Sequence, residues 1–213
     1  MQRLRIPLVV ACLYFTVACS PRDFLTRRLA AALIAGSDTF KAGQQFWLRI
    51  GVISNKDYSS PEYLVLQRRG WITGAGVPCT DQAASTAAAN PPRPSAGVPQ
   101  CWDVALTPLG IETFRDLLPN NAAPSRYFSV PAARRELVAV TGISKDGSSA
   151  DVDFTWKWVP LNEVGSALYE GNVQYNSTAS FRHYDDGWRV VEGSAAKANQ
   201  SLEDALKNAV PAQ

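Results

Sequence analysis

Histidine is nearly absent from this sequence, which has one, His183, among 213 residues. The sequence also lacks the GxSxG, HExxH and P-loop motifs, and none of its cysteines are paired at CxxC spacing. These absences exclude the commonest arrangements for a Ser–His or Cys–His nucleophile and for a zinc site. The sequence places His183 in a predicted strand just before a turn, where we expect an exposed side chain rather than a catalytic base. We therefore predict no catalytic residue, no metal site and no cofactor.

Long apolar runs and clustered basic residues are also missing. Beyond its start, the chain has no stretch of the roughly 20 apolar residues that a membrane-spanning helix needs. It has 21 Lys and Arg against 19 Asp and Glu, and this excess of basic residues is accounted for by Arg3 and Arg5. Elsewhere basic residues form pairs at most, as in Arg68-Arg69. Proteins that bind nucleic acid normally concentrate basic residues on one face, so we expect no nucleic-acid partner.

The first residues of the chain have the three parts of an export signal. Basic residues near Met1 are followed by the apolar run Ile6–Val17 and then by small residues. About 12 apolar residues suit a signal peptide and are too few for a transmembrane helix. Two stretches resemble the lipobox of bacterial lipoproteins: VVAC, which ends at Cys12, and TVAC, which ends at Cys19. We predict that residues 1–18 are a signal peptide, because cleavage before Cys19 uses the whole apolar run.

The resemblance to the lipobox implies that Cys19 carries a diacylglyceryl group and acyl chains such as palmitate. Several chains together anchor a protein stably to a membrane. Ser20 rather than Asp follows Cys19, which favours the outer over the inner membrane of a bacterial cell envelope, with the domain facing the periplasm. Two alternatives stay open: cleavage before Cys12, and an ordinary secreted protein in which Cys19 is incidental.

Cys79 and Cys101 are the cysteines that remain outside this segment. In an oxidising compartment an even pair of cysteines indicates a disulfide. The residues between them are rich in Ala, Pro and Ser and cannot bury enough apolar surface to order themselves. We predict a Cys79–Cys101 disulfide, which constrains this loop in the unfolded chain and stabilises the fold by about 3 kcal/mol.

Residues 19–125 are expected to form a mainly helical portion. Ser60-Pro61 is typical of a helix N-terminus, and Thr107-Pro108 indicates another. The order helix, Gly-Trp-Ile-Thr, long loop, strand and Leu-Thr-Pro-Leu-Gly resembles the second half of a winged-helix domain. The resemblance implies that shape, which we expect without DNA binding. The expected elements are helices at 24–35, 61–69 and 107–118 and strands at 45–53, 71–73 and 102–106.

Residues 126–213 are expected to form a curved antiparallel sheet packed by helices, which makes the fold α+β. Apolar and polar residues alternate from Asp151 to Val159, and a half-buried strand produces this period of two. The closing FRHYDDGWRVVE resembles the last hairpin of cystatin-like and NTF2-like domains. The other expected elements are strands at 134–144, 172–184 and 188–192 and helices at 162–169 and 201–210.

The lipobox, the LTxxG element and the strand pair VTGI and FTWKW together resemble a loosely defined set of bacterial lipoproteins with no assigned activity. We therefore expect a non-enzymatic binding or interaction domain, held at the membrane by its lipid anchor. Its partner is expected to be an envelope protein or a small apolar ligand. An apolar turn broken by proline follows two tryptophans, which indicates a partner surface if the turn is exposed. The candidate interaction surface consists of Trp156, Trp158, Pro160 and Leu161.

The alternative is an enzyme on an NTF2-like cup, in which acidic residues carry out acid/base chemistry. Asp151 and Asp153 share one face of an expected strand, and Asp185 and Asp186 fill an expected hairpin turn. A solvated sheet face and an ordinary turn also explain these pairs. The enzyme therefore requires a pocket near Asp153 or Asp185.

Overall fold

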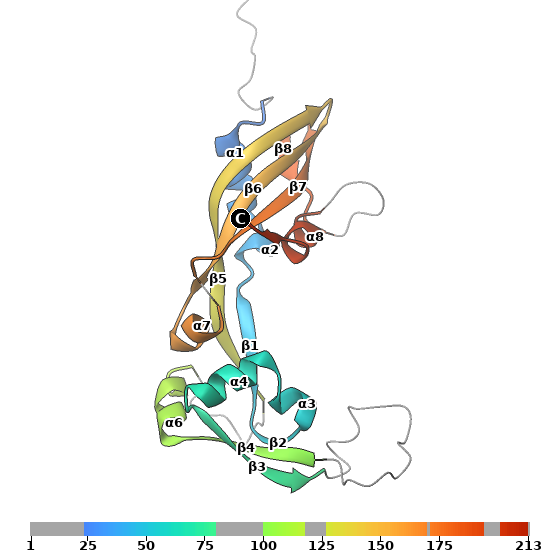
Figure 1. The fold of residues 1–213 in the computed structure, drawn as a ribbon. Helices are drawn as coiled ribbons and strands as arrows, with labels where there is room; N and C mark the ends of the chain where they lie inside the picture. The colour runs from blue at the N-terminus through green and yellow to red at the C-terminus, as the bar shows by residue number, and fades with distance from the viewer. Residues whose placement is uncertain (1–23, 80–99, 118–126, 170, 194–200, 213) are drawn as a thin grey trace, which may run out of the picture.

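The computed structural model describes residues 24–79, 100–117, 127–169, 171–193 and 201–212. It confirms the α+β class, with antiparallel sheets and several helices (Figure 1). The helices are α1 (Arg27–Gly36), α2 (Asp38–Lys41), α3 (Asn55–Tyr58), α4 (Pro61–Arg68), α6 (Pro108–Phe114), α7 (Glu163–Leu168) and α8 (Leu202–Lys207). The strands are β1 (Gln44–Arg49), β2 (Gly51–Ser54), β3 (Ile72–Pro78), β4 (Gln100–Leu106), β5 (Tyr127–Asp146), β6 (Ser149–Pro160), β7 (Gln174–Tyr184), β8 (Gly187–Val190) and β9 (Val210–Pro211).

The larger sheet has the strand order β1-β5-β6-β7-β8 among the described residues, and β9 also pairs with β7. The predicted alternation in β6 is confirmed, because Val152, Phe154 and Trp156 are buried and Asp151 and Asp153 are exposed. Helices α1 and α8 pack their apolar residues against this buried face. The upper core is formed by Leu25, Ala30, Ile34, Phe40, Val140, Ala150, Val152, Phe154, Trp156, Ala179, Phe181, Trp188, Leu202, Ala205 and Leu206.

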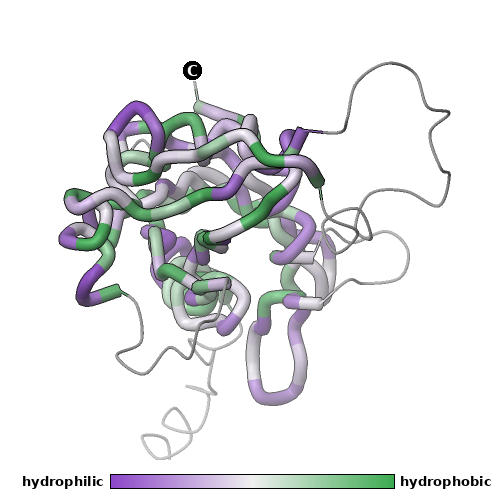
Figure 2. Tube along the Cα trace, turned by 90° about the horizontal axis from the view of Figure 1, so that it is seen from below, coloured by the Kyte–Doolittle hydropathy of each residue, from purple (hydrophilic) through white to green (hydrophobic). Residues whose placement is uncertain are grey.

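The smaller sheet has the order β2-β4-β3, and α3, α4 and α6 lie beside it at the lower end of the molecule (Figure 1). Capping side chains begin α3 and α6: Ser54 accepts a hydrogen bond from the Asp57 amide, and Thr107 accepts one from the Gly110 amide. Ser60 occupies the N-cap position of α4, but its side chain makes no cap hydrogen bond. The lower core is formed by Phe46, Leu48, Ile53, Tyr63, Leu66, Trp71, Ile72, Val104, Phe114, Val130, Ala132 and Val164. Seen from this end, hydrophobic and hydrophilic segments alternate over short distances along the chain (Figure 2).

Strand β5 contributes to both cores. Val130 and Ala132 lie in the lower core, whereas Val140 lies in the upper core. The two cores therefore do not follow a division of the chain at residue 125. Helices α1 and α2 precede that boundary but pack against the upper sheet, while α7 follows it and packs in the lower core. Apolar periodicity indicates that a helix buries one face, but it does not say against which element.

Most expected elements are confirmed, and the differences lie in short elements, at strand ends and in the expected strand at 45–53. That segment forms two strands, β1 and β2, which belong to different sheets. The short helices α2 and α3 and the short strand β9 were not predicted, because four residues or fewer carry too little periodicity. Strand β5 begins at Tyr127, seven residues before the expected start at Arg134. The last helix ends at Lys207, and Val210 belongs to a strand.

The structure joins Cys79 to Cys101 by a disulfide, with the two Cα atoms 5.0 Å apart. The bond links the end of β3 to β4, so it closes the hairpin at the base of the smaller sheet. The predicted signal peptide, Cys12, Cys19 and the loop 80–99 lie outside the described residues. None of the helices that the structure describes is both long enough and apolar enough to cross a bilayer.

Helix α7 approaches β5 so closely that Gly165 has no room for a side chain. A Cβ atom built on Gly165 would lie 1.9 Å from the backbone oxygen of Ala132. Asn162 fixes this approach, because its side chain accepts a hydrogen bond from the Gly165 amide at 2.8 Å and donates one to the Pro131 carbonyl at 2.5 Å. The apolar face of α7, with Val164, is thereby held in the lower core.

We expect Gly165→Ala to lower the free energy of unfolding by about 2–3 kcal/mol, because the added methyl must displace α7 from β5. Gly36→Ala is the matched control, since a Cβ atom at Gly36 meets nothing within 4 Å. That change should leave stability within about 0.5–1 kcal/mol of the parent protein, on the stabilising side. Urea unfolding measures both, and equal effects of the two substitutions would contradict the close contact.

Candidate functional site

Trp156 belongs to the core and not to an interaction surface. Its side chain is 2% exposed, its ring stacks on Tyr175 at 4.9 Å, and its Nε1 donates to the Ser177 hydroxyl at 3.0 Å. The prediction that it contributes to a partner surface is corrected here. The alternation of apolar and polar residues in β6 correctly predicted which side chains share the face of Trp156. It could not predict that α1 and α8 cover this face, because their packing is a tertiary feature.

Trp158 is half-buried at the junction between the two cores. Its ring contacts Trp156 at 5.2 Å and Tyr169 at 5.7 Å. The Arg135 guanidinium lies 4.8 Å from the Trp158 ring centroid and donates to the carbonyls of Thr39 and Ala42. Burial lowers the pKa of Arg135. This arginine ties the segment between α2 and β1 to the sheet, so the position of β1 depends on it.

Pro160 is half-buried, and Leu161 is 50% exposed. The Leu161 amide donates to the Ala132 carbonyl at 2.9 Å, which fixes the backbone while the side chain faces outward. Of the four residues in the predicted surface, Leu161 is the one that the structure leaves exposed. The predicted patch is therefore too small to form a partner surface without other residues.

The acidic residues that the alternative hypothesis of an acid/base enzyme requires lie in two places, beside a cavity and in a hairpin turn. The Asp153 carboxylate accepts a hydrogen bond from Thr178 at 2.7 Å and borders a cavity of about 460 Å³ between β6, β7 and the segment after α8. Asp186 lies in the β7–β8 turn and is paired with Arg189. That hydrogen bond to Arg189 lowers the pKa of the Asp186 carboxyl. The cavity is therefore beside Asp153, and Asp185 is not among its lining residues.

His183 lies in β7, as expected from its position before the turn. Its backbone amide donates to the Ser148 carbonyl at 2.8 Å, and its ring packs on Trp188 at 5.1 Å. His183 therefore has a structural role, because these contacts join the β5–β6 and β7–β8 turns.

A second groove, of about 290 Å³, runs between the outer edge of β1 and the start of α4. No local pattern in the sequence predicts this groove. Among the described strands, β5 is the single neighbour of β1, so the other edge of β1 faces this groove. The groove is lined by Gln44, Gln45, Phe46, Trp47, Arg49, Asp57, Ser60, Glu62, Tyr63 and Tyr169.

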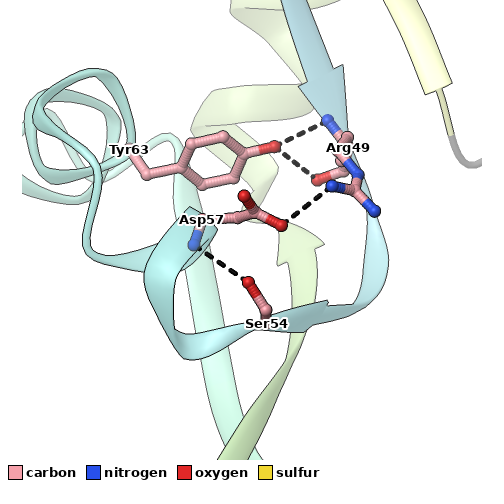
Figure 3. A network of polar contacts seen from close by, with 4 residues as sticks. All are labelled: Arg49, Ser54, Asp57 and Tyr63. Atoms are coloured by element: carbon pink, nitrogen blue, oxygen red, sulfur yellow. Dashed lines mark hydrogen bonds and ion pairs between the residues drawn. The ribbon is translucent and has the colours of Figure 1, made fainter. Parts of the chain in front are cut away.

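The hydrogen bonds of Arg49 show which backbone groups of β1 point outward. Both its amide and its carbonyl bond the Tyr63 hydroxyl, at 2.7 and 3.0 Å, on the side away from β5 (Figure 3). Backbone groups point to alternate edges along a strand, so the amides and carbonyls of Gln45 and Trp47 also point outward. Pro131, which has no amide hydrogen to donate, lies opposite Gln45 and agrees with this assignment.

Tyr63 and Asp57 hold the lower end of the groove. The Arg49 guanidinium bonds the Asp57 carboxylate at 2.8 Å, and the Ser54 side chain fixes the Asp57 amide as a helix cap (Figure 3). Burial raises the pKa of the Tyr63 hydroxyl above its ordinary value. The Arg49 guanidinium also lies 4.8 Å from the Tyr127 ring centroid. The Tyr63 hydroxyl thus occupies the position that a backbone group of a neighbouring strand would take.

Trp47 makes this edge apolar as well as open. Its side chain is 61% exposed, and Tyr127, on the paired strand, is 54% exposed. The Asp57 charge is paired with Arg49, whereas the exposed Glu62 adds a further negative charge to the groove. The arrangement can accept an extended chain: it offers backbone groups in a row, an apolar contact at one end and a negative charge on the rim.

Comparison of the chain with protein families, curated proteins and solved structures finds no match. Within the described residues, no group of three or more His, Cys, Asp or Glu side chains is placed to hold a metal ion. The groove at β1 is therefore assigned from its own geometry.

We expect Tyr63→Phe to destabilise the protein by about 1–3 kcal/mol, because it leaves the part-buried amide and carbonyl of Arg49 without their hydroxyl partner. Tyr184→Phe is the control, since Tyr184 is 48% exposed at the end of β7. Thermal or urea unfolding of both variants gives the comparison. If Tyr63→Phe has no more effect than the control, the hydroxyl does not support the edge of β1.

Proposed function

We propose that this protein is a non-enzymatic, lipid-anchored component of the bacterial cell envelope that binds an extended segment of a partner protein. The observation that carries the binding function is the open edge of β1, with outward backbone groups at Gln45 and Trp47. An extended peptide adds to such an edge by main-chain hydrogen bonds, and side-chain contacts then give specificity.

The surroundings of the edge favour a peptide over a small apolar ligand. The groove combines Trp47 with Gln44, Gln45, Asp57 and Glu62, so polar groups alternate with apolar surface along the strand. A peptide satisfies both kinds of group, whereas an apolar molecule would leave the backbone groups without partners. An uncovered strand edge presents backbone groups that can pair with another chain, which favours strand addition at this site.

The proposed membrane anchor is supported by the TVAC sequence that ends at Cys19 and by the disulfide between Cys79 and Cys101. Disulfides persist in oxidising compartments such as the periplasm, which agrees with an exported protein. We place the domain on the periplasmic side of a bacterial membrane, with Ser20 favouring the outer membrane.

We also propose that each of the two parts of the molecule resembles a known fold. The order α4, β3, β4 and α6 supports a winged-helix-like arrangement in the lower part, and α1 packed on the larger sheet supports a cystatin-like or NTF2-like arrangement in the upper part. Neither shape carries an activity by itself. The basic residues at the end of α4, Arg68 and Arg69, form no larger cluster in the sequence, so we propose no nucleic-acid partner.

A second candidate function is supported by the cavity beside Asp153. An acid/base enzyme would use that carboxylate, with Thr178 holding it in place. Substrate-library screening at this cavity separates the two functions: turnover that Asp153→Asn abolishes would favour the enzyme.

The anchor predicts the mass of the mature N-terminus. We expect the N-terminal peptide of protein extracted from membranes to begin at Cys19 and to carry a diacylglyceryl group with an amide-linked acyl chain. Cys19→Ala should abolish acylation, and Cys12→Ala should leave it unchanged. An unacylated N-terminus, or one that begins at Cys12, would contradict this assignment.

The open edge predicts a backbone-specific loss of binding. A photo-crosslinking amino acid at Glu62 reports on an occupant of the groove in intact cells. Gln45→Pro removes an outward amide without removing a bond to β5 and should lower the crosslinked yield about tenfold, while Gln45→Ala should keep most of it. Both changes remove the same side chain, so a yield that falls equally in both would contradict strand addition. The absence of any crosslink in the parent protein would contradict the site itself.

A further inference from the structure

The upper end of the larger sheet gathers exposed aromatic and basic side chains around two turns. The β5–β6 and β7–β8 turns lie together there, because Ser149 pairs with Arg182 and the His183 amide donates to the Ser148 carbonyl. Phe24, the first described residue, lies at the same end, because its ring contacts the Lys145 ammonium. We call the set Phe24, residues 145–148 and residues 184–189 the tip.

The aromatic rings of the tip alternate with cations. The Lys145 ammonium lies 5.6 Å from the Phe24 ring centroid and 5.0 Å from that of Trp188. On the other side, the Arg189 guanidinium lies 5.2 Å from the Tyr184 ring centroid. Phe24 is 53% exposed and Tyr184 is 48% exposed, so both rings face outward. Side chains with an apolar body beside a charged group are favoured where a membrane meets water.

The length of chain before Phe24 limits where the tip can be. Cys19 precedes Phe24 by five residues, and five residues span at most about 18 Å when fully extended. If Cys19 carries the lipid, Phe24 cannot move farther than that from the membrane surface. Cleavage before Cys12 would more than double the length of this connection.

The charges near the tip favour an anionic surface. The tip and the first turn of α1 contain four basic residues, Arg27, Arg28, Lys145 and Arg189. They contain three acidic residues, Asp146, Asp185 and Asp186, of which Asp186 is paired with Arg189. Basic residues close to an anionic membrane surface are attracted to it.

We propose that the tip rests in the headgroup layer of a bilayer that contains anionic phospholipid and fixes the orientation of the domain on the membrane. This proposal depends on the proposed acylation of Cys19. With the tip on the bilayer, β5 leads away from the surface. Its 20 residues correspond to about 60–65 Å of strand, so the groove beside Arg49, which pairs with the far end of β5 at Tyr127, is presented at a distance from the lipid.

Hydrogen exchange of the acylated full-length protein tests this contact. The protein is compared in vesicles of phosphatidylethanolamine with phosphatidylglycerol, in vesicles of phosphatidylcholine, and in detergent without phospholipid. We expect exchange to slow about tenfold in the two tip turns in the anionic vesicles, and less in phosphatidylcholine. Exchange in β3 and β4, in the lower part, should not change. The mass of the N-terminal peptide is measured in the same samples.

A matched pair of variants separates the tip from any other surface. Phe24→Ser combined with Lys145→Glu should remove the protection, whereas Leu109→Ser combined with Arg68→Glu, which alters an exposed apolar and a basic residue of the lower part, should preserve it. Protection that is absent in acylated protein would overturn the tip contact and leave the anchor standing. An unacylated N-terminus would overturn both. Protection that persists in detergent would show contact with protein and would also overturn the proposal.

Discussion

Both hydrophobic cores depend on β5, because this strand supplies buried residues to each of them. Val140 packs beneath α1 in the upper core, whereas Val130 and Ala132 lie in the lower one, where Ala132 approaches α7. The strand runs without a break from Tyr127 to Asp146, with two register irregularities against β6 between Leu137 and Gly142, so its loss removes buried residues from both cores. Packing at the two ends is therefore coupled, and the close approach of Gly165 to Ala132 adds a steric restraint at the lower end.

The open edge of β1 follows from the same arrangement. β1 pairs with the lower half of β5, while Arg135, on the middle of β5, holds the segment that leads into β1. The edge is thus fixed before a partner binds, which lowers the entropic cost of adding a strand. The tip lies at the opposite end of β5, so one strand connects the surface that we assign to the membrane with the groove that we assign to a partner.

Local features of the fold could be predicted from the sequence, and long-range features could not. The alternation through β6, the cap Thr107 and the Cys79–Cys101 pair each depend on residues that are close in sequence or on the chemistry of one residue type. The burial of Trp156 depends on α1 and α8, and the open edge of β1 depends on the order of the strands. Neither feature has a local signature. Gln45-Phe46-Trp47 indicated a strand, but only its place in the sheet makes Trp47 part of a groove.

The coupling of the two cores through β5 is most directly tested by urea unfolding followed by pulsed hydrogen exchange. The upper core is reported by amides of α1 and β7, and the lower core by amides of α4 and β4. The shared strand predicts one midpoint for all four elements, because neither core keeps its packing once β5 is lost. Two separate midpoints, with one core still protected while the other is fully unfolded, would contradict the account.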